Sequence, residues 1–301
     1  MSHRSERKRR RFRPYGAATP YLFLAPALLP GVVFYLLPVA MSAVLSLTDW
    51  NMLSAPRWVG LRNYSYLLTI DPQFWSTVVH TLVLALGATV TGVPVALLVA
   101  WGIGTGRGKS AWRALYWLPM VTNVVAVAYA WRFVLDPVDG VANRLLGALG
   151  LGGPEWLASP DTAMASVIAI VVWAGLGHNV LLLSAGLEDV DETLYEVARL
   201  EGAGPWQMLT RVTLPMLRPA LLFASVTTLI GGLGSFALIL VLTEGGPEGS
   251  TNVTALYMYQ TAFEHLRLGR ASAAAVLLFT VIMLLTLVQL RLFRQGGLDA
   301  D

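Results

Sequence analysis

The sequence predicts an all-α membrane protein with six transmembrane helices. Apolar residues make up 55% of its 301 residues, whereas charged residues make up only 13%, about half of the ~25% that is usual in soluble domains. The mean hydropathy is +0.61. Long segments without charge recur along the chain. They lack the alternation of apolar and polar residues that barrel strands require, so we expect helices in these segments.

Each charge-free segment is close to or longer than the ~20 residues that a helix needs to cross a ~30 Å hydrocarbon layer. Residues 1–13 form a basic tail, and residues 14–301 form one transmembrane domain. Prolines in the first three spans favour kinks in these helices. In order, the expected spans lie near residues 20–47, 77–101, 113–135, 162–187, 216–242 and 271–294.

Lysine and arginine are distributed unevenly between the two sides of these spans. Fifteen lie in the N-terminal tail, the second and fourth loops and the C-terminal end, whereas five lie in the other loops. The positive-inside rule therefore predicts that both termini are cytoplasmic. A cleaved signal peptide is disfavoured because the first apolar segment is too long and five more spans follow. Attraction to anionic headgroups explains the basic tail, so we expect no nucleic-acid partner.

Several classes of chemistry lack their residues here. The chain has no cysteine, which excludes disulfides, thiolate metal sites and a cysteine nucleophile. It contains no HExxH, GxSxG or GxxxxGK[ST] motif. We therefore expect no catalytic residue, no metal and no bound cofactor. The spans lack the paired carboxylates of a proton-coupled transporter, while a passive channel stays open as an alternative.

The loop between the fourth and fifth spans is unusual because six of the chain's 18 carboxylates fall within residues 188–201. Asp191 is a candidate N-cap for a short helix with an apolar side. Gly202 and Gly204 are suited to ending that helix, and a second helix is expected from about Pro205. Such a pair of short helices indicates either a knob that docks into another protein or an amphipathic hairpin on the bilayer.

The amino-acid sequence of this loop resembles a known motif. EVA at 196–198, EGA at 201–203, Val212 and LP at 214–215 are similar to the EAA loop of permease subunits from binding-protein-dependent ABC importers. That pattern reads E-A-A, three residues, G, nine residues and I-x-L-P. Val197 stands where alanine is usual and Glu201 where aspartate is usual, and both changes are conservative. Further motifs resemble the MalF-like sugar permeases: YLFLAP at 21–26, SLTDW at 46–50, VGLRNY at 59–64, WLP at 117–119, DPVDGVAN at 136–143 and TEGGP at 243–247.

The resemblance implies the type I ABC importer permease fold in a bacterial-type cytoplasmic membrane. It implies four kinds of partner: a homologous second permease subunit, an ABC ATPase dimer that binds ATP and Mg²⁺, an extracytoplasmic solute-binding protein and a sugar. The EAA loop would couple the permease to the ATPase. The residues implied in this coupling are Glu196, Val197, Ala198, Glu201, Gly202, Ala203 and Gly204.

The resemblance also places substrate contacts in the fourth and fifth spans. A tryptophan can stack on a sugar, and polar side chains can bond its hydroxyls. His178 is an equally good interhelical hydrogen-bond partner, and the glycines also suit close helix packing. The resemblance implies that the substrate is a mono-, di- or oligosaccharide, or alternatively glycerol phosphate or another polyol. The implied contacts are Val171, Trp173, Gly175, His178, Asn179, Thr228, Gly232 and Ser235.

Overall fold

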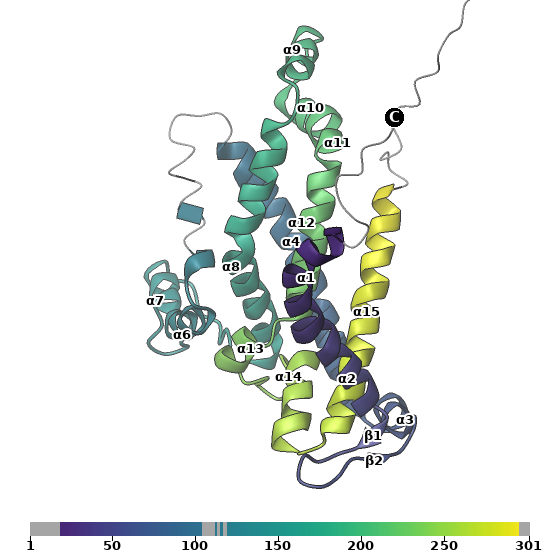
Figure 1. The fold of residues 1–301 in the computed structure, drawn as a ribbon. Coiled ribbons are helices and arrows are strands. Elements are labelled where there is room, and N and C mark those ends of the chain that lie inside the picture. The colour runs from purple at the N-terminus through teal and green to yellow at the C-terminus, as the bar shows by residue number, and fades with distance from the viewer. Residues whose placement is uncertain (1–18, 104–111, 113–114, 117–118, 295–301) are drawn as a thin grey trace, which may run out of the picture.

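The protein is a helical bundle, which confirms the all-α expectation (Figure 1). The computed structural model describes residues 19–103, 112, 115–116 and 119–294. The basic tail at 1–13 lies outside the described residues. Four helices in the described part are long and apolar enough to cross a membrane, and a bent pair brings the number to five. The count of six spans stays a prediction.

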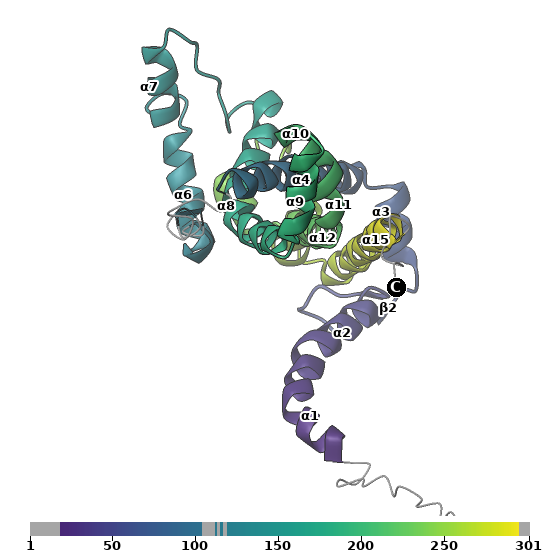
Figure 2. The same ribbon diagram turned by 90° about the horizontal axis from the view of Figure 1, so that it is seen from above.

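The first helical segment stands apart from the rest of the bundle (Figure 2). It comprises α1 (Thr19–Gly31), the π-helical turn η1 (Val32–Leu36) and α2 (Leu37–Leu45). None of residues 28–45 is buried, and contact with the bundle runs mainly through α2 and α15 (Leu268–Arg294). Two prolines lie inside α1, as expected for an irregular first span.

Three long helices form the centre of the bundle. α4 (Pro72–Ile103) packs against both α8 (Pro160–Glu188) and α12 (Arg218–Leu233). α4 and α12 approach closely at Gly232, where a Cβ would lie only 2.7 Å from the Cα of Ala85. The absence of a side chain at Gly232 permits this approach. The core at one end of these helices consists of Val93, Ala96, Leu97, Ala100, Val180, Leu183, Leu217 and Ala224.

The fifth span, expected near residues 216–242, is broken in the structure. α12 ends at Leu233, Gly234 caps it, and α13 (Ala237–Leu242) begins after the break. Three glycines within four residues, 231–234, weaken the helix here because glycine has low helix propensity. On the other side, the segment Pro205–Met216 meets α12 at a bend of 74°.

The third expected span, 113–135, lies partly outside the described residues. Its described part contains α6 (Val124–Val134), which is 11 residues long. Asn123 caps α6 because its side chain accepts a hydrogen bond of 2.8 Å from the backbone N–H of Val125. α7 (Val141–Ala148) follows, contacts α6 and continues beyond its end (Figure 2).

Small elements form the lower end of the bundle in Figure 1. β1 (Thr48–Asp49) and β2 (Arg57–Trp58) pair antiparallel, with Thr48 opposite Trp58. α3 (Arg62–Thr69), α14 (Thr254–Tyr259) and the π-helical turn η3 (Gln260–Glu264) lie at the same end. Each of these segments is too short to show a clear periodic pattern in the sequence.

Candidate functional site

A hairpin of two short helices projects from the upper end of the bundle (Figure 1). α9 (Glu192–Leu200) begins after Asp191, whose carboxylate accepts a 2.9 Å hydrogen bond from the backbone N–H of Thr193. This bond holds the pKa of Asp191 below its usual value. α10 (Pro205–Met208) forms the second arm. The N-cap and the two helices thus occur where the sequence predicts them.

Glycine makes the turn of this α9–α10 hairpin. Gly202 has a φ of +80°, and its N–H donates to the carbonyl of Arg199 at 3.0 Å. Left-handed geometry of this kind favours glycine at a helix C-terminus. Gly204 precedes α10, and its N–H donates to the side chain of Gln207 at 3.0 Å. A Cβ at either glycine would have no neighbour within 4 Å, so the space beside each glycine is open.

The outer surface of the hairpin is apolar and acidic. Ala198 is the one buried residue of α9, whereas Leu200 is 89% exposed and Val197 is 54% exposed. The carboxylates of Glu196 and Glu201 are also exposed, and Ala203 and Gly204 are half-buried. A contiguous apolar surface that leaves the bundle in this way is typical of an interaction site. Leu194 and Trp206 extend the exposed apolar surface.

A polar contact joins the hairpin to the bundle. The hydroxyl oxygens of Tyr195 and Thr213 lie 3.0 Å apart, and the Thr213 hydroxyl also lies 3.2 Å from the carbonyl of Met208, to which it donates. Thr213 belongs to the π-helical turn η2 (Leu209–Thr213), which α11 (Leu214–Met216) follows on the way to α12. Tyr195 and Thr213 are not among the site residues that the sequence predicts. A hydrogen bond across 18 residues leaves no local sequence pattern.

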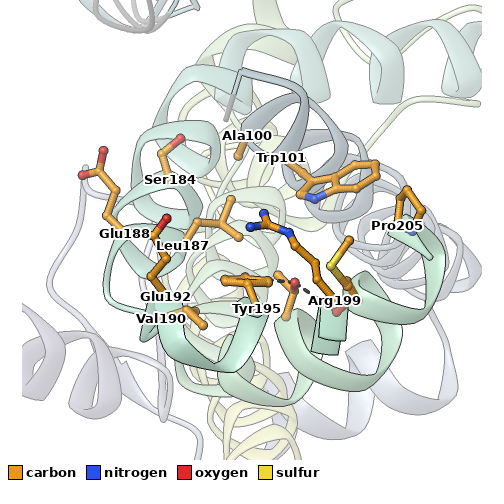
Figure 3. Close-up of a pocket in the computed structure, with 12 residues that line it drawn as sticks. Ala100, Trp101, Ser184, Leu187, Glu188, Val190, Glu192, Tyr195, Arg199 and Pro205 are labelled. Carbon is orange, nitrogen blue, oxygen red and sulfur yellow. Dashed lines mark hydrogen bonds between the residues drawn. The ribbon is translucent and has the colours of Figure 1, made fainter. Parts of the chain in front are cut away.

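A cavity of about 520 Å³ lies between the hairpin and the ends of α4 and α8 (Figure 3). The guanidinium of Arg199 points into it in Figure 3. The cavity was not anticipated from the sequence. Its lining comprises Ala100, Trp101, Ser184, Leu187, Glu188, Val190, Glu192, Tyr195, Arg199, Pro205, Met208 and Thr213.

Trp173 is the proposed substrate residue with the clearest access. It lies on α8, is 39% exposed, and contacts Trp131 edge-on with ring centroids 5.3 Å apart. It lines a second cavity, of about 270 Å³, together with Tyr116 and Pro119. Gly175 on the same helix is exposed, and a Cβ there would have no neighbour within 4 Å. This face of α8 therefore offers an aromatic surface next to free space.

The other implied substrate residues are mostly engaged within the protein. Asn179 is only 4% exposed and donates to the Thr228 hydroxyl at 2.9 Å, which links α8 to α12. The Ser235 hydroxyl donates to the carbonyl of Gly231 at 2.9 Å. His178 is half-buried, and its imidazole makes no hydrogen bond within the part of the chain that the structure describes.

Packing accounts for two more of these residues. Gly232 packs against α4, and Val171 packs against a core cluster of α4, α6, α8, α13 and α14. The structure therefore does not bring the eight implied residues together in one cavity.

The motif residues at the opposite end of the bundle bind one another. Asn63 of VGLRNY donates to the carbonyls of Ser46 and Thr48 in SLTDW, each at 2.8 Å. The hydroxyl oxygens of Tyr64 and Ser46 lie 2.7 Å apart. These two motifs thus build one folded end.

The DPVDGVAN motif also folds a loop. The Asn143 side chain donates to the carbonyls of Pro137 at 3.0 Å and Pro154 at 3.1 Å, and it accepts a 2.6 Å bond from the Trp156 indole. Asp136 accepts backbone N–H bonds from Asp139 and Val138, which lower the pKa of its carboxyl group. The described residues contain no cluster of three metal-ligating side chains.

Comparison with known proteins identifies the family. Residues 92–296 match the family described as the inner membrane component of binding-protein-dependent transport systems. The chain belongs to this family of ABC transporter permeases. It is therefore an integral membrane protein, and the resemblance seen in its EAA-like loop is confirmed at the level of the family.

Individual relatives cover nearly the whole permease. It is 32% identical over 283 residues to the probable ABC transporter permease protein YurN of Bacillus subtilis, which covers 92% of this chain and 96% of the relative. It is 28% identical over 279 residues to the arabinooligosaccharides transport system permease protein AraP of Bacillus subtilis, with 91% and 88% covered.

A solved structure resembles the permease over a similar length. This is a bacterial ABC transporter involved in the import of the acidic polysaccharide alginate, which matches with a TM-score of 0.77, 25% identity, and coverage of 92% of this chain and 95% of that one. The permease thus has the type I ABC importer fold that the resemblance implied.

Proposed function

We propose that this permease moves a sugar or oligosaccharide into the cytoplasm as a membrane subunit of an ATP-driven importer. Two of the similar proteins are named for arabinooligosaccharide transport and alginate import, and both match over most of the chain. The exposed Trp173 beside a cavity supports the same substrate class, because aromatic faces stack on sugar rings. The orientation remains the one that the positive-inside rule predicts, with both termini cytoplasmic.

The α9–α10 hairpin is the proposed coupling element, and its outward apolar surface is the observation that carries the proposal. Leu200 and Val197 would enter a cleft of an ABC ATPase that binds ATP and Mg²⁺, and Glu196 would make a charged contact there. Closure of the ATPase dimer would push on α9. The bond between Tyr195 and Thr213 would pass this movement to η2 and α12, which favours rigid-body motion of the bundle.

Among the implied substrate residues, we assign direct contact to Trp173 and His178. Trp173 would stack on the sugar, and half-buried His178 would bond a hydroxyl. Asn179 and Thr228 already bond each other, so we assign them to the packing of α8 against α12. The binding protein would dock at the opposite end of the bundle, where the SLTDW and VGLRNY motifs lie, and a homologous permease would complete the membrane pair.

Co-purification tests this assembly. The tagged permease, expressed with its native partners and extracted in mild detergent, should bring an ABC ATPase, a second permease and a solute-binding protein. ATP hydrolysis by this complex should increase when the binding protein is loaded with sugar. A permease that purifies without an ATPase, yet conducts sugar in liposomes without ATP, would contradict the proposal and favour the channel.

A further inference from the structure

The cavity beneath the α9–α10 hairpin lies at the ends of two helices that are long enough to cross a membrane. Ala100 and Trp101 lie in the last turn of α4, and Ser184 and Leu187 lie near the end of α8. Both helices are long enough to cross a membrane. Their ends therefore lie near the level of the lipid headgroups, where tryptophan is enriched. The cavity thus opens at the boundary between bilayer and water.

An exposed arginine, Arg199, lines the cavity. Arg199 belongs to α9, and its guanidinium is directed into the cavity (Figure 3). Within the described part of the chain, this guanidinium forms neither an ion pair nor a hydrogen bond. Ser184 on the cavity wall is 1% exposed, and its hydroxyl has no hydrogen-bond partner either. A guanidinium and an unpaired hydroxyl together favour an oxyanion, to which a guanidinium can bond through two N–H groups.

The surrounding charges limit the charge of the ligand. Glu188 and Glu192 also line the cavity, and the Glu188 side chain is directed away from Arg199 in Figure 3. The carboxylate of Glu192 opposes a multiply charged anion, whereas the guanidinium of Arg199 attracts a single negative charge. A phosphodiester carries one negative charge. The electrostatics therefore favour a phosphodiester over a dianionic phosphate.

An apolar surface continues from the cavity along the membrane helix. Val95, Leu98 and Trp101 repeat every three residues on α4, and all three are exposed. Residues at this spacing lie on one side of a helix. Acyl chains attached to a headgroup in the cavity would run along this side. A soluble phosphate compound has no acyl chain that could contact this apolar surface.

We propose that this cavity binds the phosphodiester headgroup of a phospholipid, held by Arg199, with the acyl chains along Val95, Leu98 and Trp101 of α4. The headgroup contacts one face of α9 through Arg199, whereas Val197 and Leu200 leave the opposite side free for a protein partner. The lipid would thus tie α9 to the bilayer. Lipid binding itself does not depend on the proposed coupling to an ATPase.

Native mass spectrometry of the purified permease in detergent tests this site. The probes are phosphatidylglycerol and diacylglycerol with the same acyl chains, so that only the headgroup differs. We expect the wild-type chain to retain phosphatidylglycerol and the Arg199→Gln variant to bind it at least about tenfold more weakly, which corresponds to about 1.4 kcal/mol. The matched control is Arg211→Gln, which removes an exposed arginine of η2 that is outside the cavity and should bind like wild type.

Three results would overturn the proposal. The first is equal loss of binding in the Arg199 and Arg211 variants, which would indicate general attraction to surface charge. The second is equal retention of diacylglycerol, because that lipid lacks the phosphate. The third is stabilisation of the lipid-free protein by inorganic phosphate that disappears in Arg199→Gln, which would assign the cavity to a free phosphate ion. Thermal unfolding of each variant checks its folding, and none of these readouts depends on transport.

Discussion

Replacement of Gly202 separates the backbone role of this residue from its role at a partner surface. Its φ of +80° is unfavourable for any residue with a Cβ, at a cost of about 1–2 kcal/mol. Alanine and tryptophan share this cost. Neither side chain would meet its own subunit at the Cβ, because no atom lies within 4 Å of that position. Gly202→Ala is therefore the control for the backbone cost, and we expect any further loss in Gly202→Trp to come from the bulk of the indole at a partner surface.

The expected effect follows from the cost of overfilling a packed site. Excess volume in a well-packed contact costs about 1–3 kcal/mol. A coupling free energy of this size corresponds to about a 5- to 150-fold change. We expect Gly202→Ala to keep most of the ATP-driven uptake, and Gly202→Trp to lose most of it while it still inserts into the membrane.

The assay is uptake of substrate by proteoliposomes that contain the assembled importer, with the loaded binding protein outside and ATP inside. Insertion of each variant is checked by its yield in membranes and its elution in size-exclusion chromatography. ATPase retained with the tagged permease gives a second readout. Equal uptake by the alanine and tryptophan variants would refute the docking of this turn into a partner.

Three further predictions concern the interior and the opposite end. Thr228→Val should leave the buried Asn179 amide without its 2.9 Å bond and lower the free energy of unfolding by about 1–3 kcal/mol; an unchanged thermal midpoint would exclude this bond as a packing element. His178→Ala should weaken substrate-stimulated uptake, and unchanged stimulation would remove its contact role. Burial and the hydrogen bond to Asp71 raise the pKa of Tyr257 above its usual 10.0, so its contribution to stability is complete below pH 10 and is lost at higher pH. Tyr257→Phe should reduce the decline of the unfolding midpoint above pH 10, and an identical decline in both proteins would assign it to other groups.

The features that the sequence predicts well depend on local patterns. The long apolar helices need only composition, and the α9–α10 hairpin needs an N-cap at Asp191 and a glycine at 202. These signals lie within a few residues of the element they specify. The sequence therefore predicts this hairpin with its turn and both helices.

The features that the sequence does not predict depend on distant contacts. The cavity with Arg199 forms only when the ends of α4, α8 and α9 meet. Asp71 bonds Tyr257 at 2.6 Å across 186 residues, and no periodicity indicates such a pair. Asn179 has a polar side chain in an apolar span, which suits a ligand and a helix contact equally. Its bond to Thr228 becomes visible only in the fold.

The motif residues show the same division. Three residues of the family-like motifs form hydrogen bonds that connect loops in the structure: Asn63, Tyr64 and Asn143. A motif therefore located the family without revealing which of its residues contact a partner.

Photocrosslinking from single cysteines tests the central claim most directly, because the chain has no native cysteine. Leu200→Cys at the hairpin, which is 89% exposed, and Leu53→Cys near the opposite end, which is 80% exposed, would each carry a benzophenone label in the assembled complex. We predict that the Leu200 label captures the ABC ATPase and that the Leu53 label does not. Capture of the ATPase from position 53, or of the solute-binding protein from position 200, would contradict the account.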